Sequence, residues 1–157
     1  MKPANVTTTQ DEATGQILIV DDLPNWREAL TDLLAADGYV VHSAAEPSQA
    51  LELLTREPVD VVILDLRLQD GDMYDVRGVQ LLEEIRAKSP GTCIIMMTGF
   101  PSVGLLEKIK NRIYTVDAFW MKNPAGRHFD IELFREEIRA LVEKSQRYKM
   151  QLAKPSP

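Results

Sequence analysis

Four apolar segments of the sequence each end at a polar residue whose side chain could take part in phosphoryl chemistry. Their β-branched, strand-length composition is typical of strands buried in a parallel sheet. If these strands are neighbours, the side chains that follow them surround one crevice, because open α/β sheets bind ligands at the carboxyl ends of their strands. In chain order, the residues at these ends are Asp21 and Asp22, Asp65, Thr98 and Lys122.

This set of side chains suits the phosphorylation of a carboxylate. A lone aspartate such as Asp65 can attack phosphorus and form an acyl phosphate. The incoming charge calls for a divalent cation, and Mg²⁺ prefers oxygen ligands. Asp22 and Asp65 could bind the ion directly, and Asp21 could reach it through water. Thr98 and Lys122 would bind the phosphoryl oxygens, since this chemistry depends on positioning and electrostatic stabilisation.

Strand and helix patterns alternate along the chain and would position these residues. The predicted strands are 17–20, 39–43, 59–65, 92–98 and 118–121. The predicted helices are 24–37, 47–57, 79–88, 102–112 and 130–144, the fourth with Val103, Leu106 and Ile109 on one side. This alternation predicts an α/β protein with a parallel sheet covered by helices on both faces.

The chain has 157 residues, which is enough for one domain with a substantial core. We expect a disordered leader over residues 1–16, a single domain over 17–144 and a basic tail over 145–157. The tail is too short to hold a second domain. Residues 69–77 are polar and acidic, and they predict a long loop after Asp65.

Composition and charge narrow the class of protein. Contents of 45% hydrophobic and 27% charged residues are those of a soluble globular protein. The net charge of −6 argues against a broad nucleic-acid-binding surface. No apolar run approaches the roughly 18 residues that span a bilayer. The single cysteine, Cys93, cannot form an intrachain disulfide, which suits a reducing cytoplasm.

The order and placement of Asp21-Asp22, Asp65, Thr98 and Lys122, each after its own strand, resemble the receiver domain of bacterial two-component response regulators. The resemblance extends over about residues 17–143. It implies a doubly wound, flavodoxin-like (βα)5 fold whose five-stranded parallel sheet has the order 2-1-3-4-5.

The resemblance also implies a role for each site residue. Asp65 is expected to be the phosphoacceptor. Asp21 and Asp22 would bind Mg²⁺ together with Asp65 and with the main-chain carbonyl of Arg67. Lys122 is expected to contact the phosphoryl group. A protein with this site is a signalling phosphoacceptor rather than an enzyme, with only self-phosphorylation and autodephosphorylation expected.

In the same family, phosphorylation shifts an equilibrium between two conformations. Thr98 and Phe119 are the expected switch residues, and the face of the fourth helix, fifth strand and fifth helix is the expected output surface. The implied partners are a sensor histidine kinase or phosphotransfer protein, and a downstream protein or a missing output domain. A homodimer is possible, whereas direct binding of nucleic acid or membrane is not expected. The expected location is the cytoplasm.

The sequence departs from the family in two loops. Asn123 follows Lys122 where most receivers have proline in a cis peptide bond, and a cis bond before Asn123 would cost about 3 kcal/mol. The loop after Asp65 is longer than usual and brings extra acidic residues. We also hypothesise that Arg67 and Phe100 shield the phosphoryl group from water.

Three alternatives remain open. A hydrolase of the haloacid-dehalogenase type would need a general acid at position 67, which is Arg67. A flavin- or nucleotide-binding protein would need a phosphate-binding loop after the first strand, where this chain has two acids instead. A pseudo-receiver, which binds partners without being phosphorylated, is the third alternative.

Overall fold

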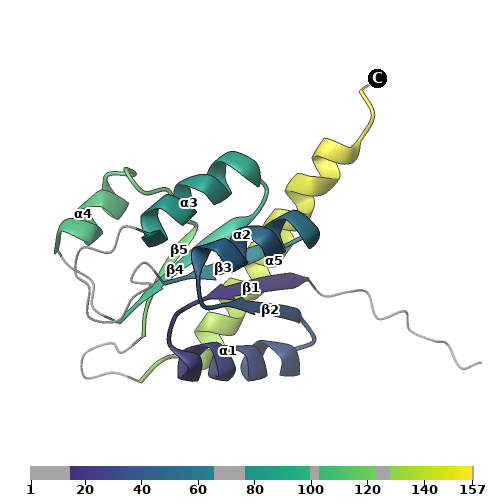
Figure 1. Ribbon diagram of the computed structural model, residues 1–157. Coiled ribbons are helices and arrows are strands. Elements are labelled where there is room, and N and C mark those ends of the chain that lie inside the picture. The colour runs from purple at the N-terminus through teal and green to yellow at the C-terminus, as the bar shows by residue number, and fades with distance from the viewer. Residues whose placement is uncertain (1–14, 66–76, 100–102, 123–127, 157) are drawn as a thin grey trace, which may run out of the picture.

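A computed structural model describes residues 15–65, 77–99, 103–122 and 128–156. Strands and helices alternate through these residues (Figure 1). The strands are β1 (Gln16–Val20), β2 (Val40–Ala44), β3 (Val61–Leu64), β4 (Cys93–Thr98) and β5 (Ala118–Met121). The helices are α1 (Pro24–Ala36), α2 (Pro47–Arg56), α3 (Arg77–Lys88), α4 (Val103–Lys110) and α5 (Ile131–Ala153).

The five strands form one sheet in which every paired neighbour is parallel. The strand order is β2-β1-β3-β4-β5, as the resemblance implied. After β2 the chain returns across β1 to place β3 on its other side. The order therefore reverses between β1 and β3, and such a switch point is where doubly wound folds place their ligands.

Two apolar clusters cover the two faces of the sheet, because successive side chains of a strand point in opposite directions. Leu18 and Val20 of β1 lie in the cluster formed with α2, α3 and α4. Ile17 and Ile19 lie in the cluster formed with α1 and α5. The strands β1, β3 and β4 are almost wholly buried, which explains their continuous apolar sequences. The doubly wound α/β prediction is confirmed.

The last helix is longer than the sequence pattern predicted. We expected it to end at Lys144 and a tail to follow, but α5 continues to Ala153. Figure 1 shows its last turns extending past the other elements. Its apolar stripe stops at Val142, and the next inward residues are Ser145, fully buried, and Lys149. Polar contacts replace apolar ones there, so hydrophobic periodicity gave no sign of the final turns.

Those polar contacts join α5 to the amino-terminal edge of the sheet. Lys149 Nζ donates to the main-chain oxygen of Val59 at 2.8 Å and to Oδ1 of Asp60 at 2.9 Å. Asp60 is buried and also accepts a bond from the Gln16 amide at 2.9 Å. Lys144 Nζ donates to Asp117 at 2.8 Å, just before β5. We call this set of contacts the α5 clamp.

The apolar side that we assigned to α4 is only partly correct. Val103 and Leu106 are 75% and 42% exposed. Leu105 and Ile109 instead pack against the core. The shortness of α4 explains the difference, because a helix of two turns gives too few repeats to distinguish neighbouring faces from sequence. A consequence is that α4 presents apolar side chains to solvent.

Across the parts of the chain that the structure describes, none of the helices is sufficiently long and apolar to pass through a bilayer. The expected leader lies outside the described residues, except for its last two positions. Gln16 at that boundary already pairs with Val40 as the first residue of β1.

Candidate functional site

Backbone hydrogen bonds continue the sheet one residue beyond the strands and thereby position the site. The Asp21 amide donates to the Ala44 carbonyl at 3.1 Å, and the Asp65 amide donates to the Val20 carbonyl at 2.9 Å. The Lys122 amide donates to the Thr98 carbonyl at 2.9 Å. These bonds fix the backbone of Asp21, Asp65 and Lys122 at the carboxyl edge of the sheet, so the starting point of each side chain is fixed as well.

Three carboxylates meet at this edge. One oxygen each of Asp21, Asp22 and Asp65 lies within 4.8 Å of the others. Asp21 and Asp65 are only 3% and 5% exposed, and Asp22 is partly buried. Like charges at this separation and burial repel each other, so the group is stable only with positive charge nearby. Three carboxylates are also the hard oxygen donors that Mg²⁺ prefers, so the donor set fits that ion.

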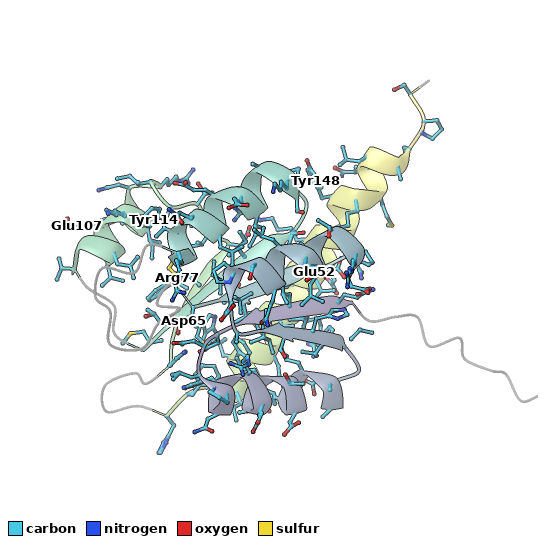
Figure 2. All side chains as sticks on the ribbon, viewed as in Figure 1. Glu52, Asp65, Arg77, Glu107, Tyr114 and Tyr148 are labelled. Atoms are coloured by element: carbon cyan, nitrogen blue, oxygen red, sulfur yellow. The ribbon has the colours of Figure 1, made fainter. Side chains whose placement is uncertain are left out.

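Lys122 supplies positive charge from the protein itself. Its ammonium lies 2.5 Å from Oδ2 of Asp21 and 2.8 Å from Oδ2 of Asp65, and the side chain is almost fully buried. A buried lysine without partners would be strongly unfavourable, whereas one paired with two carboxylates is tolerated. Lys122 thus ties β5 to the ends of β1 and β3. Asp65 is labelled at this end of the sheet in Figure 2.

The turn that follows β1 is held by the first aspartate. Oδ1 of Asp21 accepts a hydrogen bond from the Leu23 amide at 2.9 Å. Leu23 caps α1, and Pro24 occupies its first turn, where a missing N–H does no harm. Arg27 Nη1 donates to the main-chain oxygen of Asp21 at 2.7 Å. This arginine was not predicted from the sequence, although its place one turn into α1 could have suggested it.

The two expected switch residues lie on neighbouring strands. Thr98 ends β4 and is 1% exposed. Phe119 of β5 is partly buried and packs against the same core cluster as Leu105 and Ile109 of α4. Phe119 therefore lies on the face of the sheet that α4 covers, whereas its neighbour Trp120 packs on the opposite face.

An aromatic side chain lies next to the site lysine. The Lys122 ammonium is 5.4 Å from the ring centroid of Trp26, which comes from the first turn of α1. Trp26 is also a core residue, because the indole packs against the cluster between α1 and α5.

Several predicted positions lie outside the described residues. These are Arg67, the acidic loop, Phe100 and Asn123. Among the described residues, the histidines take no part in the site: His42, in the middle of β2, forms a hydrogen bond through Nε2 with the Gln16 side chain, and His128 is exposed. The described site therefore consists of Asp21, Asp22, Asp65, Thr98 and Lys122.

A doubly wound sheet with this acidic site and buried lysine defines the class of receiver-like signalling domains. A family model for the response regulator receiver domain matches residues 17–115. The chain belongs to the response regulator receiver domain family.

The chain resembles both long regulators and a short phosphotransferase. It is 38% identical over 87 residues to the transcriptional regulatory protein GlrR of Escherichia coli K12, a match that covers 55% of this chain. The match spans only 18% of that regulator's length. It is 30% identical over 95 residues to the sporulation initiation phosphotransferase F of Bacillus subtilis, covering 60% of this chain and 73% of that protein.

Solved structures agree on the fold. A signal receiver domain of an HD domain-containing protein from Pseudomonas fluorescens superimposes with a TM-score of 0.72 at 27% identity. That match covers 93% of this chain and 98% of the other. A CheY-like receiver domain protein from Methanospirillum hungatei gives 0.70 at 26% identity, covering 85% and 98%.

Proposed function

We propose that this chain receives a phosphoryl group on Asp65 from a phosphohistidine of a sensor histidine kinase or phosphotransfer protein. The single observation that supports it best is the convergence of three carboxylates and the Lys122 ammonium at the switch point of the sheet. A simple acidic patch would have no reason to bury a lysine among its carboxylates. Membership of the family and the similarity to a phosphotransferase point in the same direction.

In the proposed reaction, an oxygen of the Asp65 carboxylate forms a bond to phosphorus. The bond from phosphorus to the donor histidine nitrogen breaks, and its electron pair stays with that nitrogen. Lys122 and Thr98 then contact the phosphoryl oxygens, and Lys122 offsets their negative charge. The chain acts as an acceptor in signalling, and its own catalysis is limited to self-phosphorylation and autodephosphorylation.

Mg²⁺ is the proposed cofactor. Asp21, Asp22 and Asp65 would hold it, together with the main-chain carbonyl of Arg67, which lies outside the described residues. When bound, the ion would neutralise the charge that gathers on the phosphoryl oxygens. The fit of three oxygen donors within 4.8 Å supports this assignment.

We further propose that phosphorylation repositions Thr98 and Phe119 and so changes the face made by α4, β5 and α5. The packing of Phe119 and of α4 against the same core cluster supports a link between the site and that face. The exposure of Val103 and Leu106 on α4 supplies an apolar surface for a partner. Its occupant is a downstream protein, an output domain or a second copy of the chain.

The proposed receiver domain extends from residue 17, where the family match begins, through the clamped part of α5. The earlier boundary at residue 144 would divide this helix. A cytoplasmic location, where histidine kinases present their phosphate, also remains a proposal.

Intact-mass spectrometry after incubation with Mg²⁺ and acetyl phosphate tests the proposed function. We expect the wild-type chain to gain the mass of one phosphoryl group and Asp65→Asn to gain none. Asp70→Asn is a matched control, since it removes an acid near the same segment of the sequence and should leave the adduct intact. A folded wild type that accepts phosphate neither from acetyl phosphate nor from a kinase would instead support the pseudo-receiver.

A further inference from the structure

The Lys122 ammonium contacts three groups of two chemical kinds. Two are the carboxylates of Asp21 and Asp65, at 2.5 and 2.8 Å. The third is the indole of Trp26, whose centroid lies 5.4 Å away. An ammonium is attracted to the face of an aromatic ring at such a distance, most strongly to tryptophan. The attraction is larger where water is excluded, and Lys122 is only 4% exposed.

The indole is itself held by other aromatic rings. Trp26 meets the edge of Phe129 at 6.2 Å between centroids, at an interplanar angle of 65°. Phe129 in turn lies 5.2 Å from Phe134 of α5 and 5.3 Å from Trp120 of β5. Such edge-to-face and tilted contacts fix ring orientation, because aromatic rings carry a negative face and a positive edge. The contact with Phe129 therefore restrains the orientation of the Trp26 ring beside the site.

A contact of this kind would leave the lysine free to bind phosphate. An ammonium has three N–H donors, and hydrogen-bonding partners would occupy them. An aromatic face attracts the whole cation without accepting a directed hydrogen bond of comparable strength. The indole can therefore restrain the ammonium and leave its donors for the carboxylates and for an incoming phosphoryl oxygen.

We propose that Trp26 is a positioning residue for phosphoryl transfer, which holds the Lys122 ammonium between Asp21 and Asp65. This role rests on the proposed phosphorylation of Asp65. Trp26 does not touch the reacting atoms, and it acts through the lysine. Trp120 belongs to the same group of rings but packs against Phe129 and Phe134 instead, so it offers a matched control.

The first experiment measures the rate of phosphorylation by acetyl phosphate with Mg²⁺ in Trp26→Leu, Trp26→Phe, Trp120→Leu and wild type. We expect Trp26→Leu to be slower by about tenfold and Trp26→Phe by only about twofold, since phenylalanine keeps an aromatic face. Trp120→Leu, which removes a ring that contacts Phe129 rather than Lys122, should lose much less than Trp26→Leu. A folded Trp26→Leu with the wild-type rate, or an equal loss in Trp120→Leu, overturns the proposal.

A second experiment covers the case in which Trp26→Leu does not fold. In the Trp120→Phe chain, Trp26 is the one remaining tryptophan of two, so fluorinated tryptophans replace it alone. Fluorine weakens the negative ring face and barely alters ring shape. We expect the rate to fall stepwise as fluorines are added, whereas a purely packing role predicts no trend and contradicts the proposal.

The design separates this inference from the proposed function. If wild type gains a phosphoryl group and the aromatic variants do not differ, only the inference fails. If wild type gains none in the presence of a working donor, the proposed function fails and the positioning role falls with it.

Discussion

Lys122 shows how strongly one buried side chain can depend on its partners. Its ammonium faces Asp21 and Asp65, and all three side chains are nearly inaccessible to solvent. A buried ion pair adds little net stability over apolar residues, but removal of one member leaves uncompensated charge. The stability of the folded chain should therefore fall when a substitution removes the positive charge at this position and change less when the charge is kept.

Replacement of Lys122 by methionine should destabilise the metal-free chain by about 3 kcal/mol, because two buried carboxylates lose the ammonium that lies between them. Added Mg²⁺ should recover part of this loss, since binding to the folded state alone stabilises it. Urea unfolding with EDTA and with Mg²⁺ measures both effects. Lys110→Met, at an exposed position on α4, is the control. A loss for Lys122→Met that Mg²⁺ leaves unchanged would contradict this view of the site.

At the residue scale, the sequence predicted side chains that directly follow strands. Asp21, Asp65 and Lys122 could be placed because a parallel sheet brings its carboxyl ends together. The contacts of Trp26 and Arg27 could not be placed in the same way. They depend on where the first turn of α1 directs its side chains once the turn after β1 has formed, and no periodic pattern records that direction.

Among the elements, α4 ends in a recognisable capping motif. The Ile113 amide donates to the Lys108 carbonyl and the Arg112 amide to the Ile109 carbonyl, the two bonds of a Schellman motif. Arg112 has a φ of 56°, in the left-handed region that favours glycine. A side chain at this position strains the end of the helix.

Substitution Arg112→Gly should therefore stabilise the chain by about 0.5 to 1 kcal/mol, the strain relief being partly offset by the greater freedom of glycine when unfolded. Thermal and urea unfolding would measure the change. Arg112→Ala removes the same charge and keeps the strain, so it should give no gain. An equal gain from both variants would point to charge rather than backbone conformation.

The contact between α5 and β5 should make stability depend on pH. Burial alone would raise the pKa of Asp117, but hydrogen bonds from Lys144, the Ile94 amide and Arg86 outweigh it and hold the pKa below its ordinary value of 3.8. A carboxyl with a lowered pKa adds stability above its unfolded pKa, and this contribution is lost as the pH falls through the folded pKa.

We expect Asp117→Asn to be less stable than wild type at neutral pH, and the difference to shrink as the pH falls below about 3.8. Urea unfolding over a pH series gives the free energy of unfolding of both proteins as a function of pH. Glu107→Gln removes an exposed carboxylate, and its free energy of unfolding should depend on pH as that of wild type does. A difference that stays constant down to low pH would show that the charge of Asp117 is not responsible.

At the scale of the elements, long patterns were predicted better than short or polar ones. β1, β3 and β4 are continuous apolar runs, and each was placed to within two residues. The faces of α4 could not be separated over so few turns. The end of α5 was missed because Ser145 and Lys149 occupy inward positions that a search for apolar spacing reads as surface.

The whole molecule has ionic groups at both ends of its sheet and apolar packing between them. The carboxyl edge carries Asp21, Asp65 and Lys122, and the amino edge carries the α5 clamp. Tyr148, labelled in Figure 2, lies at the end of the sheet opposite to Asp65. It packs over Gly91, where an added Cβ would lie 2.7 Å from the tyrosine ring.

Loss of the clamp should weaken the whole domain. Lys149→Met leaves Asp60 buried, with a hydrogen bond from the Gln16 amide and a 3.4 Å contact from Ser145. We expect a loss of about 1 to 3 kcal/mol, reduced from the value for a fully buried pair because the lysine side chain is 36% exposed.

Unfolding by urea measures this loss, and Lys154→Met at the exposed end of the chain is the control. Addition of Asp60→Asn to Lys149→Met should restore part of the stability, because the buried charge is then gone. If the double variant is no better than the single one, packing by the lysine stem rather than charge explains the effect.

The topology as a whole followed from the family resemblance rather than from local patterns. Alternating strands and helices predicted a parallel sheet covered on two faces, but several strand orders satisfy that description. The order 2-1-3-4-5 came from the resemblance alone, and the observed sheet has that order, with β1 beside β3 and the carboxylates of Asp21 and Asp65 close together.

The crowding of acids around Asp65 also bears on attempts to engineer this domain. Asp22 adds a third charge beside Asp21 and Asp65, and among the described residues no lysine or arginine lies within ion-pair distance of it. Sites built for ligands are commonly destabilising until the ligand arrives. A directed-evolution campaign that selects for heat resistance alone would be expected to replace Asp22 early, and its most stable variants would lack one of the carboxylates proposed to hold Mg²⁺. Screens on this scaffold should therefore select for metal binding alongside survival.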